Sequence, residues 1–220
     1  MKAMILAAGR GERMRPLTDH TPKPLLMAGS KRLIEYHLFN LANAGFKDVV
    51  INVAWLGQKI IDTLGKGEKY NLNIAYSNEG EQALETGGGI YNALPLLGNE
   101  PFLVINGDVW TDYPFKELRN ISLQDKAHLV LVNNPEYNPD GDFSILNNRL
   151  IENTPEKYTF SGIGVYSADF FKGYNNGKFP LAPMIRRYIS ENKISGELFK
   201  GRWMDIGTQQ RLDDLTQLVK

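Results

Sequence analysis

The sequence contains no cysteine, only three histidines and no excess of charge of either sign, because lysine plus arginine and aspartate plus glutamate number 25 each. Without cysteine the chain can form no disulfide and use no thiolate, which fits a reducing compartment. Balanced charge leaves no overall field to attract nucleic acid or an anionic membrane. We therefore expect neither as a partner.

Long apolar runs are absent too. The run at residues 3–8 is too short to cross a bilayer, and Arg10, Arg13 and Arg15 follow it where a signal peptide would need its cleavage site. We expect a cytoplasmic protein. Its 220 residues, 42% apolar and 23% charged, are typical of a globular chain with a sizeable core, and we expect a single domain over residues 1–220.

Apolar patterning predicts strands and helices that alternate in the first part of the chain. Strands are expected at 3–8, 49–53 and 72–76, and helices at 31–44 and 57–64, ended by Gly45 and Gly65. This alternation is typical of an α/β fold with a mixed, mainly parallel sheet flanked by helices. Further strands are expected at 102–108, 127–132, 143–146 and 159–166, and further helices from residue 90, at 181–190 and at 209–219, the last capped by Thr208.

The first strand runs into a loop with Gly9 and Gly11, and Lys23 follows between two prolines. Glycines let backbone N–H groups approach an anion closely, and the prolines favour extended backbone, so that Lys23 would project from a stiff loop. The arrangement suits a nucleoside triphosphate. It matches neither the dinucleotide fingerprint nor the P-loop pattern, so the residues alone leave open a simple glycine turn with solvated arginines.

Two aspartates are candidate metal ligands. The expected strand at 102–108 ends in Asn106-Gly107-Asp108, and a carboxylate at such a strand end can hold Mg²⁺, which takes only one or two protein carboxylates. A plain turn aspartate is the alternative. Asp205, in Trp203-Met204-Asp205-Ile206-Gly207-Thr208, has the same two interpretations. Only the fold could bring two such distant residues together.

These motifs resemble the signature of the sugar-1-phosphate nucleotidyltransferases. The resemblance is carried by LAAGRGERMRPLT at 6–18, PKP at 22–24, LETGG at 84–88 and WMDIGT at 203–208, and it extends over essentially the whole chain. It implies a Rossmann-like, GT-A-like fold. It also implies that Lys23 lies beside the reacting α-phosphate, that Arg13 contacts phosphate, and that Asp108 and Asp205 bind Mg²⁺.

The resemblance further implies which residues hold the two substrates. The predicted nucleotide-binding residues are Leu6, Ala7, Ala8, Gly9, Gly11, Glu12, Arg13, Lys23, Gln82, Thr86, Gly87 and Gly88, and the predicted sugar-binding residues are Asn106, Gly141, Asp142 and Glu152. The predicted catalytic residues are Lys23, Arg13 and Asp108. Composition alone favours a flexible loop for the glycine run at 87–89, a turn residue for Asp142 and an exposed surface residue for Glu152.

Within the family the chain is most similar to N-acetylmuramic acid α-1-phosphate uridylyltransferases of bacterial cell-wall recycling. The evidence is ETGGG at 85–89, NGDVWTD at 106–112 and GDF at 141–143. The implied substrates are UTP and a sugar 1-phosphate, used by a monomer or small homo-oligomer. Mannose-1-phosphate guanylyltransferases and other hexose-1-phosphate nucleotidyltransferases share most of the pattern. A GT-A glycosyltransferase or an inactive sugar-nucleotide-binding module also stays open, although the first would leave Lys23 unexplained.

Overall fold

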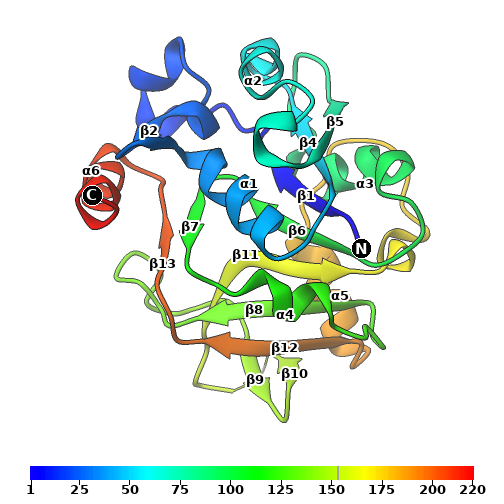
Figure 1. The fold of residues 1–220 in the computed structure, drawn as a ribbon. Coiled ribbons are helices and arrows are strands. Elements are labelled where there is room, and N and C mark those ends of the chain that lie inside the picture. The colour runs from blue at the N-terminus through cyan, green and yellow to red at the C-terminus, as the bar shows by residue number, and fades with distance from the viewer. Residues whose placement is uncertain (153) are drawn as a thin grey trace.

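A nine-stranded mixed sheet crosses the molecule in the order β5-β4-β1-β6-β11-β8-β12-β10-β9 (Figure 1). The computed structural model describes residues 1–152 and 154–220. The strands of the sheet are β1 Ala3–Leu6, β4 Asp48–Val53, β5 Asn73–Asn78, β6 Phe102–Asn106, β8 Ala127–Val132, β9 Ser144–Leu146, β10 Arg149–Ile151, β11 Thr159–Tyr166 and β12 Ile194–Phe199. Strands β5, β4, β1 and β6 are parallel neighbours, while β11 runs antiparallel between β6 and β8.

Helices cover both faces of this sheet, as the alternating pattern predicts. They are α1 Leu33–Asn43, α2 Gly57–Leu64, α3 Glu85–Leu97, α4 Phe115–Arg119, α5 Ala182–Ser190 and α6 Gln209–Leu218. Because successive side chains of a strand point to opposite faces, Ile5 of β1 packs in one core with α1, α2 and α4, and Met4 packs in the other with α3 and α5. The expected fold class is confirmed. One sheet contains strands from residue 3 to residue 199, and the single domain over residues 1–220 stays a prediction.

Two short strand pairs lie outside the main sheet. The pair β2 Met27–Ala28 with β3 Lys31–Arg32 precedes α1, and β7 Val109–Thr111 pairs antiparallel with β13 Trp203–Asp205. A third core, which includes Trp110 and Ile206, packs α6 beside β2 at one edge of the molecule (Figure 1). Neither pair is predicted by the sequence, because strands this short carry too few residues to show a period. The elements β10, β12 and α4 are also unpredicted.

The strand expected at 3–8 ends at Leu6 and the helix expected at 31–44 begins at Leu33, and two further predicted boundaries that bear on the site are also wrong. The strand expected at 102–108 ends at Asn106: the amide of Gly107 makes the last bond to β1, donating to the carbonyl of Leu6 at 2.9 Å, and the chain turns at residues 107–108. The helix expected from residue 90 begins at Glu85, so the glycine run at 87–89 is helical and not a flexible loop. That run packs tightly, since a Cβ on Gly88 would lie 2.1 Å from the carbonyl oxygen of Gly177.

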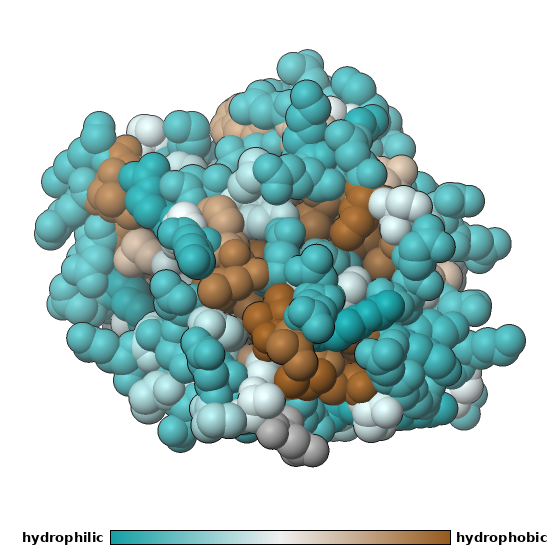
Figure 2. All heavy atoms as spheres, turned by 90° about the horizontal axis from the view of Figure 1, so that it is seen from below, coloured by the Kyte–Doolittle hydropathy of each residue, from teal (hydrophilic) through white to brown (hydrophobic). Residues whose placement is uncertain are grey.

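The residues predicted to end or cap helices are found in those positions. Gly45 follows the C-cap residue of α1 with φ 88°, a left-handed conformation that glycine adopts freely. Thr208 caps α6, its hydroxyl accepting from the amide of Arg211. Seen from below, hydrophilic side chains cover most of the surface, and apolar ones gather near its middle (Figure 2). Within the described residues, every helix is too short or too polar to cross a bilayer.

Candidate active site

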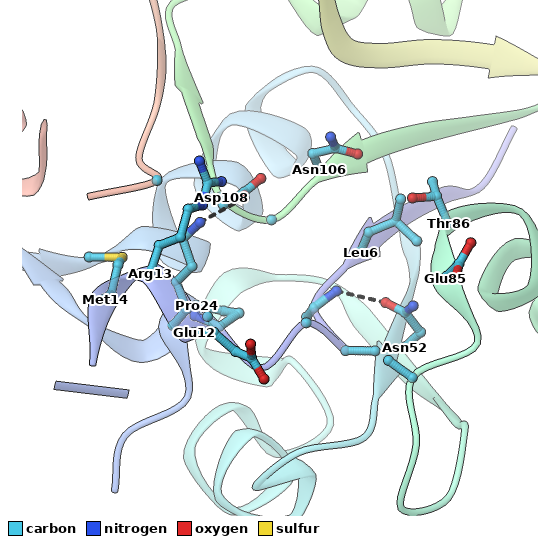
Figure 3. A pocket seen from close by; sticks show the side chains of 18 of the residues that line it. Leu6, Glu12, Arg13, Met14, Pro24, Asn52, Glu85, Thr86, Asn106 and Asp108 are labelled. Carbon is cyan, nitrogen blue, oxygen red and sulfur yellow. Dashed lines mark hydrogen bonds and ion pairs between the residues drawn. The ribbon is translucent and has the colours of Figure 1, made fainter. Parts of the chain in front are cut away.

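A cavity of about 360 Å³ opens at the carboxyl ends of the parallel strands. Leu6 of β1 stands in register with Asn52 of β4 on one side and Asn106 of β6 on the other, and all three line the cavity. Ligands of open α/β sheets bind in this position, beyond the carboxyl ends of the strands. The glycine loop, the start of α3 and the turn after β6 complete the walls (Figure 3).

The glycine loop is folded closely onto the segment that carries Lys23. Gly11 has φ 69°, its carbonyl accepts from the hydroxyl of Thr18 at 2.8 Å, and a Cβ on it would lie 3.2 Å from Cβ of Lys23. Gly9 has open space where a side chain would stand. The cavity is lined by the predicted residues Leu6, Ala7, Ala8, Gly9, Gly11, Glu12, Arg13 and Lys23. Their contact with nucleotide stays a prediction.

Lys23 forms an ion pair with Asp108 inside this cavity, Nζ lying 2.7 Å from Oδ2 (Figure 3). The lysine side chain is 9% exposed and the aspartate 37%, so the lysine is held and the carboxylate faces the opening. Contrary to the expectation of extended backbone, Lys23 begins a 3₁₀ turn, Lys23–Leu25, because the amide of Leu25 donates to Pro22 and that of Leu26 to Lys23. The turn still delivers the ammonium to the cavity.

The short ribbon of β7 and β13 brings the second aspartate to the same end of the molecule. Asp205 stands opposite Val109, and the amide of Ile206 donates to the carbonyl of Asp108 at 2.7 Å. Oδ2 of Asp205 lies 3.3 Å from a guanidinium nitrogen of Arg211. Asp205 lines a neighbouring cavity of about 340 Å³, whereas Gly207 lines the first. The fold thus supplies a proximity that sequence spacing could not predict.

The chemistry of these two aspartates suits the predicted magnesium site, which stays a prediction. Oδ1 of Asp205 is buried and has no hydrogen-bond partner among the described residues, so it is an acceptor that a cation would satisfy. Carboxylate oxygens are the ligands Mg²⁺ prefers, and phosphate oxygens and water commonly supply the rest. Within residues 1–152 and 154–220, no cluster of three or more His, Asp or Glu side chains is placed to hold a metal. The magnesium prediction therefore rests on Asp108 and Asp205.

Asn52 and Glu79 are among the lining residues that the sequence did not predict. Oδ1 of Asn52 accepts from the amide of Ala7 at 2.7 Å, and its Nδ2 donates to Oε1 of Glu79 at 2.6 Å. Burial raises the pKa of Glu79, and hydrogen bonds from the amide of Leu84 and from Asn52 oppose that rise. A single polar residue inside the apolar run VVINV was the only signal in the sequence.

Several predicted ligands lie outside the set of residues that line the cavity. Thr86 and Asn106 line it, but Gln82 is exposed. Gly87 packs against Phe179, and Gly88 packs against Gly177. Asp142, next to Gly141, accepts from the amide of Phe160 at 2.8 Å. Glu152 pairs with Arg186. The nucleotide and sugar contacts assigned to these residues stay predictions.

The fold and the cavity define a nucleotidyl transferase, and comparison with known proteins agrees. The model of the Nucleotidyl transferase family matches residues 2–144, and the chain belongs to this family. A solved structure from Bacillus anthracis, described as a glucose-1-phosphate thymidylyltransferase, superimposes with a TM-score of 0.86 at 23% identity, covering 99% of this chain and 94% of its own. That likeness confirms the expected fold.

The chain is also similar in sequence to several enzymes of named activity. The chain is 51% identical, over 227 residues, to an N-acetylmuramate alpha-1-phosphate uridylyltransferase of Neisseria meningitidis, covering 100% of this chain and 98% of the relative. It is 32% identical to the enzyme of that name from Caulobacter vibrioides, over 94% and 92% of the two chains. A mannose-1-phosphate guanyltransferase of Yarrowia lipolytica is 42% identical over only 60% of this chain and 37% of its own length.

Proposed function

We propose that the protein transfers a uridylyl group from UTP to N-acetylmuramic acid α-1-phosphate, forming UDP-N-acetylmuramic acid and pyrophosphate. The observation that carries the proposal is the ion pair of Lys23 with Asp108 in a cavity walled by the glycine loop. The two relatives that match along nearly their whole length support the choice of base and sugar.

In this reaction an oxygen of the sugar phosphate attacks the α-phosphorus of UTP in line. The new bond joins that oxygen to the α-phosphorus, and the bond to the bridging oxygen of the β-phosphate breaks to release pyrophosphate. Both reactants are anions, so positioning and charge neutralisation do most of the catalytic work.

Each group of the cavity has a part in this chemistry. The ammonium of Lys23 would donate to the oxygens of the α-phosphoryl group as charge gathers there, and Arg13 with the amides of the glycine loop would hold the leaving pyrophosphate. Mg²⁺ bound by Asp108 and Asp205 would supply the further positive charge that phosphoryl transfer needs. We infer a cytoplasmic enzyme of peptidoglycan recycling, active as a monomer or small homo-oligomer.

The test is pyrophosphate release from a panel of triphosphates (UTP, dTTP, GTP) combined with N-acetylmuramic acid, N-acetylglucosamine, glucose and mannose 1-phosphates, with Mg²⁺ present. We expect UTP with N-acetylmuramic acid α-1-phosphate to give the highest kcat/KM. A maximum with GTP and mannose 1-phosphate would identify a guanylyltransferase instead. Sugar transfer from a UDP-sugar without pyrophosphate would indicate a glycosyltransferase, and nucleotide binding without any turnover would indicate a binding module.

A further inference from the structure

Asn52 and Glu79 stand between two loops of the cavity that are far apart in the chain. We propose that this pair couples the glycine loop, residues 7–11, to the loop that precedes α3, residues 79–86, so that a triphosphate held by one loop and its base held by the other are bound as a unit. The inference rests on the proposed function, because it assigns the two loops to the two ends of one nucleotide. Asn52 and Glu79 are positioning residues in this scheme.

Three hydrogen bonds in series make the connection. The amide of Ala7 donates to Oδ1 of Asn52 at 2.7 Å, Nδ2 of Asn52 donates to Oε1 of Glu79 at 2.6 Å, and the amide of Leu84 donates to Oε2 of Glu79 at 2.6 Å. One end of the series is the first residue of the glycine loop. The other end is Leu84, directly before Glu85, and Glu85 lines the cavity.

The pair is held by rigid elements. Asn52 is 3% exposed and lies near the end of β4, in register with Leu6 of β1. The third glycine of the run in α3, Gly89, makes room for this pair. A Cβ at this position would lie 2.4 Å from Oε1 of Glu79 and 2.9 Å from Nδ2 of Asn52. The missing side chain leaves the space that the pair occupies. A helix otherwise gains nothing from glycine at this position.

The donors and acceptors of these three hydrogen bonds can be arranged in only one way. A backbone amide can only donate, so Oδ1 of Asn52 must face Ala7, and its Nδ2 must then face Glu79, which as a carboxylate accepts from both sides. Glu79→Gln turns one N–H toward another donor, either Asn52 or the amide of Leu84. Asn52→Asp sets two carboxylates against each other.

The double variant Asn52→Asp with Glu79→Gln reverses the central bond and restores the pattern. The new amide at 79 donates to the carboxylate at 52, which still accepts from Ala7, and the amide oxygen at 79 still accepts from Leu84. Each single variant breaks one bond of the series, whereas the double variant breaks none.

The experiment measures the affinities of UTP, uridine and inorganic tripolyphosphate by calorimetry, together with KM and kcat. We expect each single variant to bind UTP about 10- to 100-fold more weakly, in line with the loss of a hydrogen bond to a charged group. Uridine and tripolyphosphate, which each engage one loop, should change by less than about threefold, the uncertainty of mutational energies. KM for UTP should rise while KM for the sugar phosphate stays constant, and the double variant should recover most of the UTP affinity.

The matched control is Asn92→Ala. Asn92 bonds the hydroxyl of Ser77 and so joins α3 to β5 without reaching the glycine loop, and its loss should leave UTP affinity unchanged. Equal weakening of all three ligands, unchanged UTP affinity in the single variants, or no recovery in the double variant would each overturn the coupling. If the wild type prefers another triphosphate, the proposed function fails, and the coupling is then measured with that triphosphate and its own nucleoside.

Discussion

Nζ of Lys23 lies 2.7 Å from Oδ2 of Asp108, although 85 positions separate the two residues in the chain. The pair joins the segment after the glycine loop to the turn after β6. Because the lysine is nearly buried and the carboxylate is partly open, the ammonium is fixed in place before any substrate arrives. A preorganised charge of this kind needs no rearrangement when the reaction begins.

Removing either member of this pair should abolish turnover with little effect on the fold. Lys23→Met keeps the apolar stem and loses the charge, and Asp108→Asn keeps the shape and loses the carboxylate. We expect kcat to fall by about 10²–10³ or more, the usual cost of losing one preorganised group, with the melting temperature within a few degrees of wild type. Pyrophosphate release measures kcat, and thermal unfolding measures the melting temperature. Turnover like that of wild type in either variant would remove the assignment.

Asp205 should control the magnesium requirement. Asp205→Asn removes a carboxylate with one buried oxygen that has no hydrogen-bond partner in residues 1–152 and 154–220. The Mg²⁺ concentration for half-maximal activity should therefore rise about tenfold or more, as is typical when a metal site is impaired. The stabilisation that Mg²⁺ gives to the UTP complex in thermal melting should fall in parallel. Asp213→Asn, on the exposed side of α6, is the control and should change neither quantity. An unaltered magnesium requirement would exclude Asp205 as a ligand.

Gly88→Ala should destabilise the protein although alanine favours helices. The added Cβ would lie 2.1 Å from the carbonyl oxygen of Gly177, a contact that only movement of backbone can relieve. Overpacking of this kind costs about 1–3 kcal/mol. Gly9→Ala is the matched control for stability, because no atom of the described part of the chain lies within 4 Å of the added Cβ, neighbours in sequence aside. Denaturant unfolding of both variants checks the prediction, and equal stability of the two would contradict the tight packing of α3.

Glu35 should make stability fall in acid. Burial disfavours its charge, but hydrogen bonds from Lys69, the amide of Arg32 and Tyr70 prevail and lower its pKa to about 2 from an ordinary value of 4.5. A lowered folded-state pKa contributes stability that is complete above about pH 4.5 and lost as the pH falls toward 2.

The variant Glu35→Gln should therefore melt below the wild type at pH 7, and the gap should narrow between about pH 4.5 and 2. Thermal melting at a series of pH values measures this, with the exposed Glu117→Gln as the control. A gap that stays constant down to pH 2 would show that the carboxylate of Glu35 is not held in its charged form.

Features of this fold that have local determinants are predictable from the sequence. The glycine loop and the motif around Lys23 lie within two dozen residues, and short-range backbone preferences place Gly45 and Thr208 at helix ends. The start of α3 was misjudged because glycine is a poor helix former, whereas Gly177 and Phe179, far along the chain, decide the packing there.

Long-range partners explain what was missed. A lone asparagine in a strand carries no mark of the amide it will face, so the bond of Asn52 with Ala7 becomes visible only in the fold. The approach of Asp205 to Asp108 likewise depends on β7 and β13, three residues each, which are too short for a recognisable period. Family resemblance predicted this proximity, and the ribbon provides its physical cause.

The ribbon of β7 and β13 also sets an order of events during synthesis. A ribosome makes Lys23 and Asp108 well before the strand that carries Asp205, because β13 is the last strand of the chain. A chain halted between β12 and β13 would lack Asp205 as well as Gly207, which lines the cavity. A site that uses both aspartates can therefore form only after β13 has been made and has paired with β7.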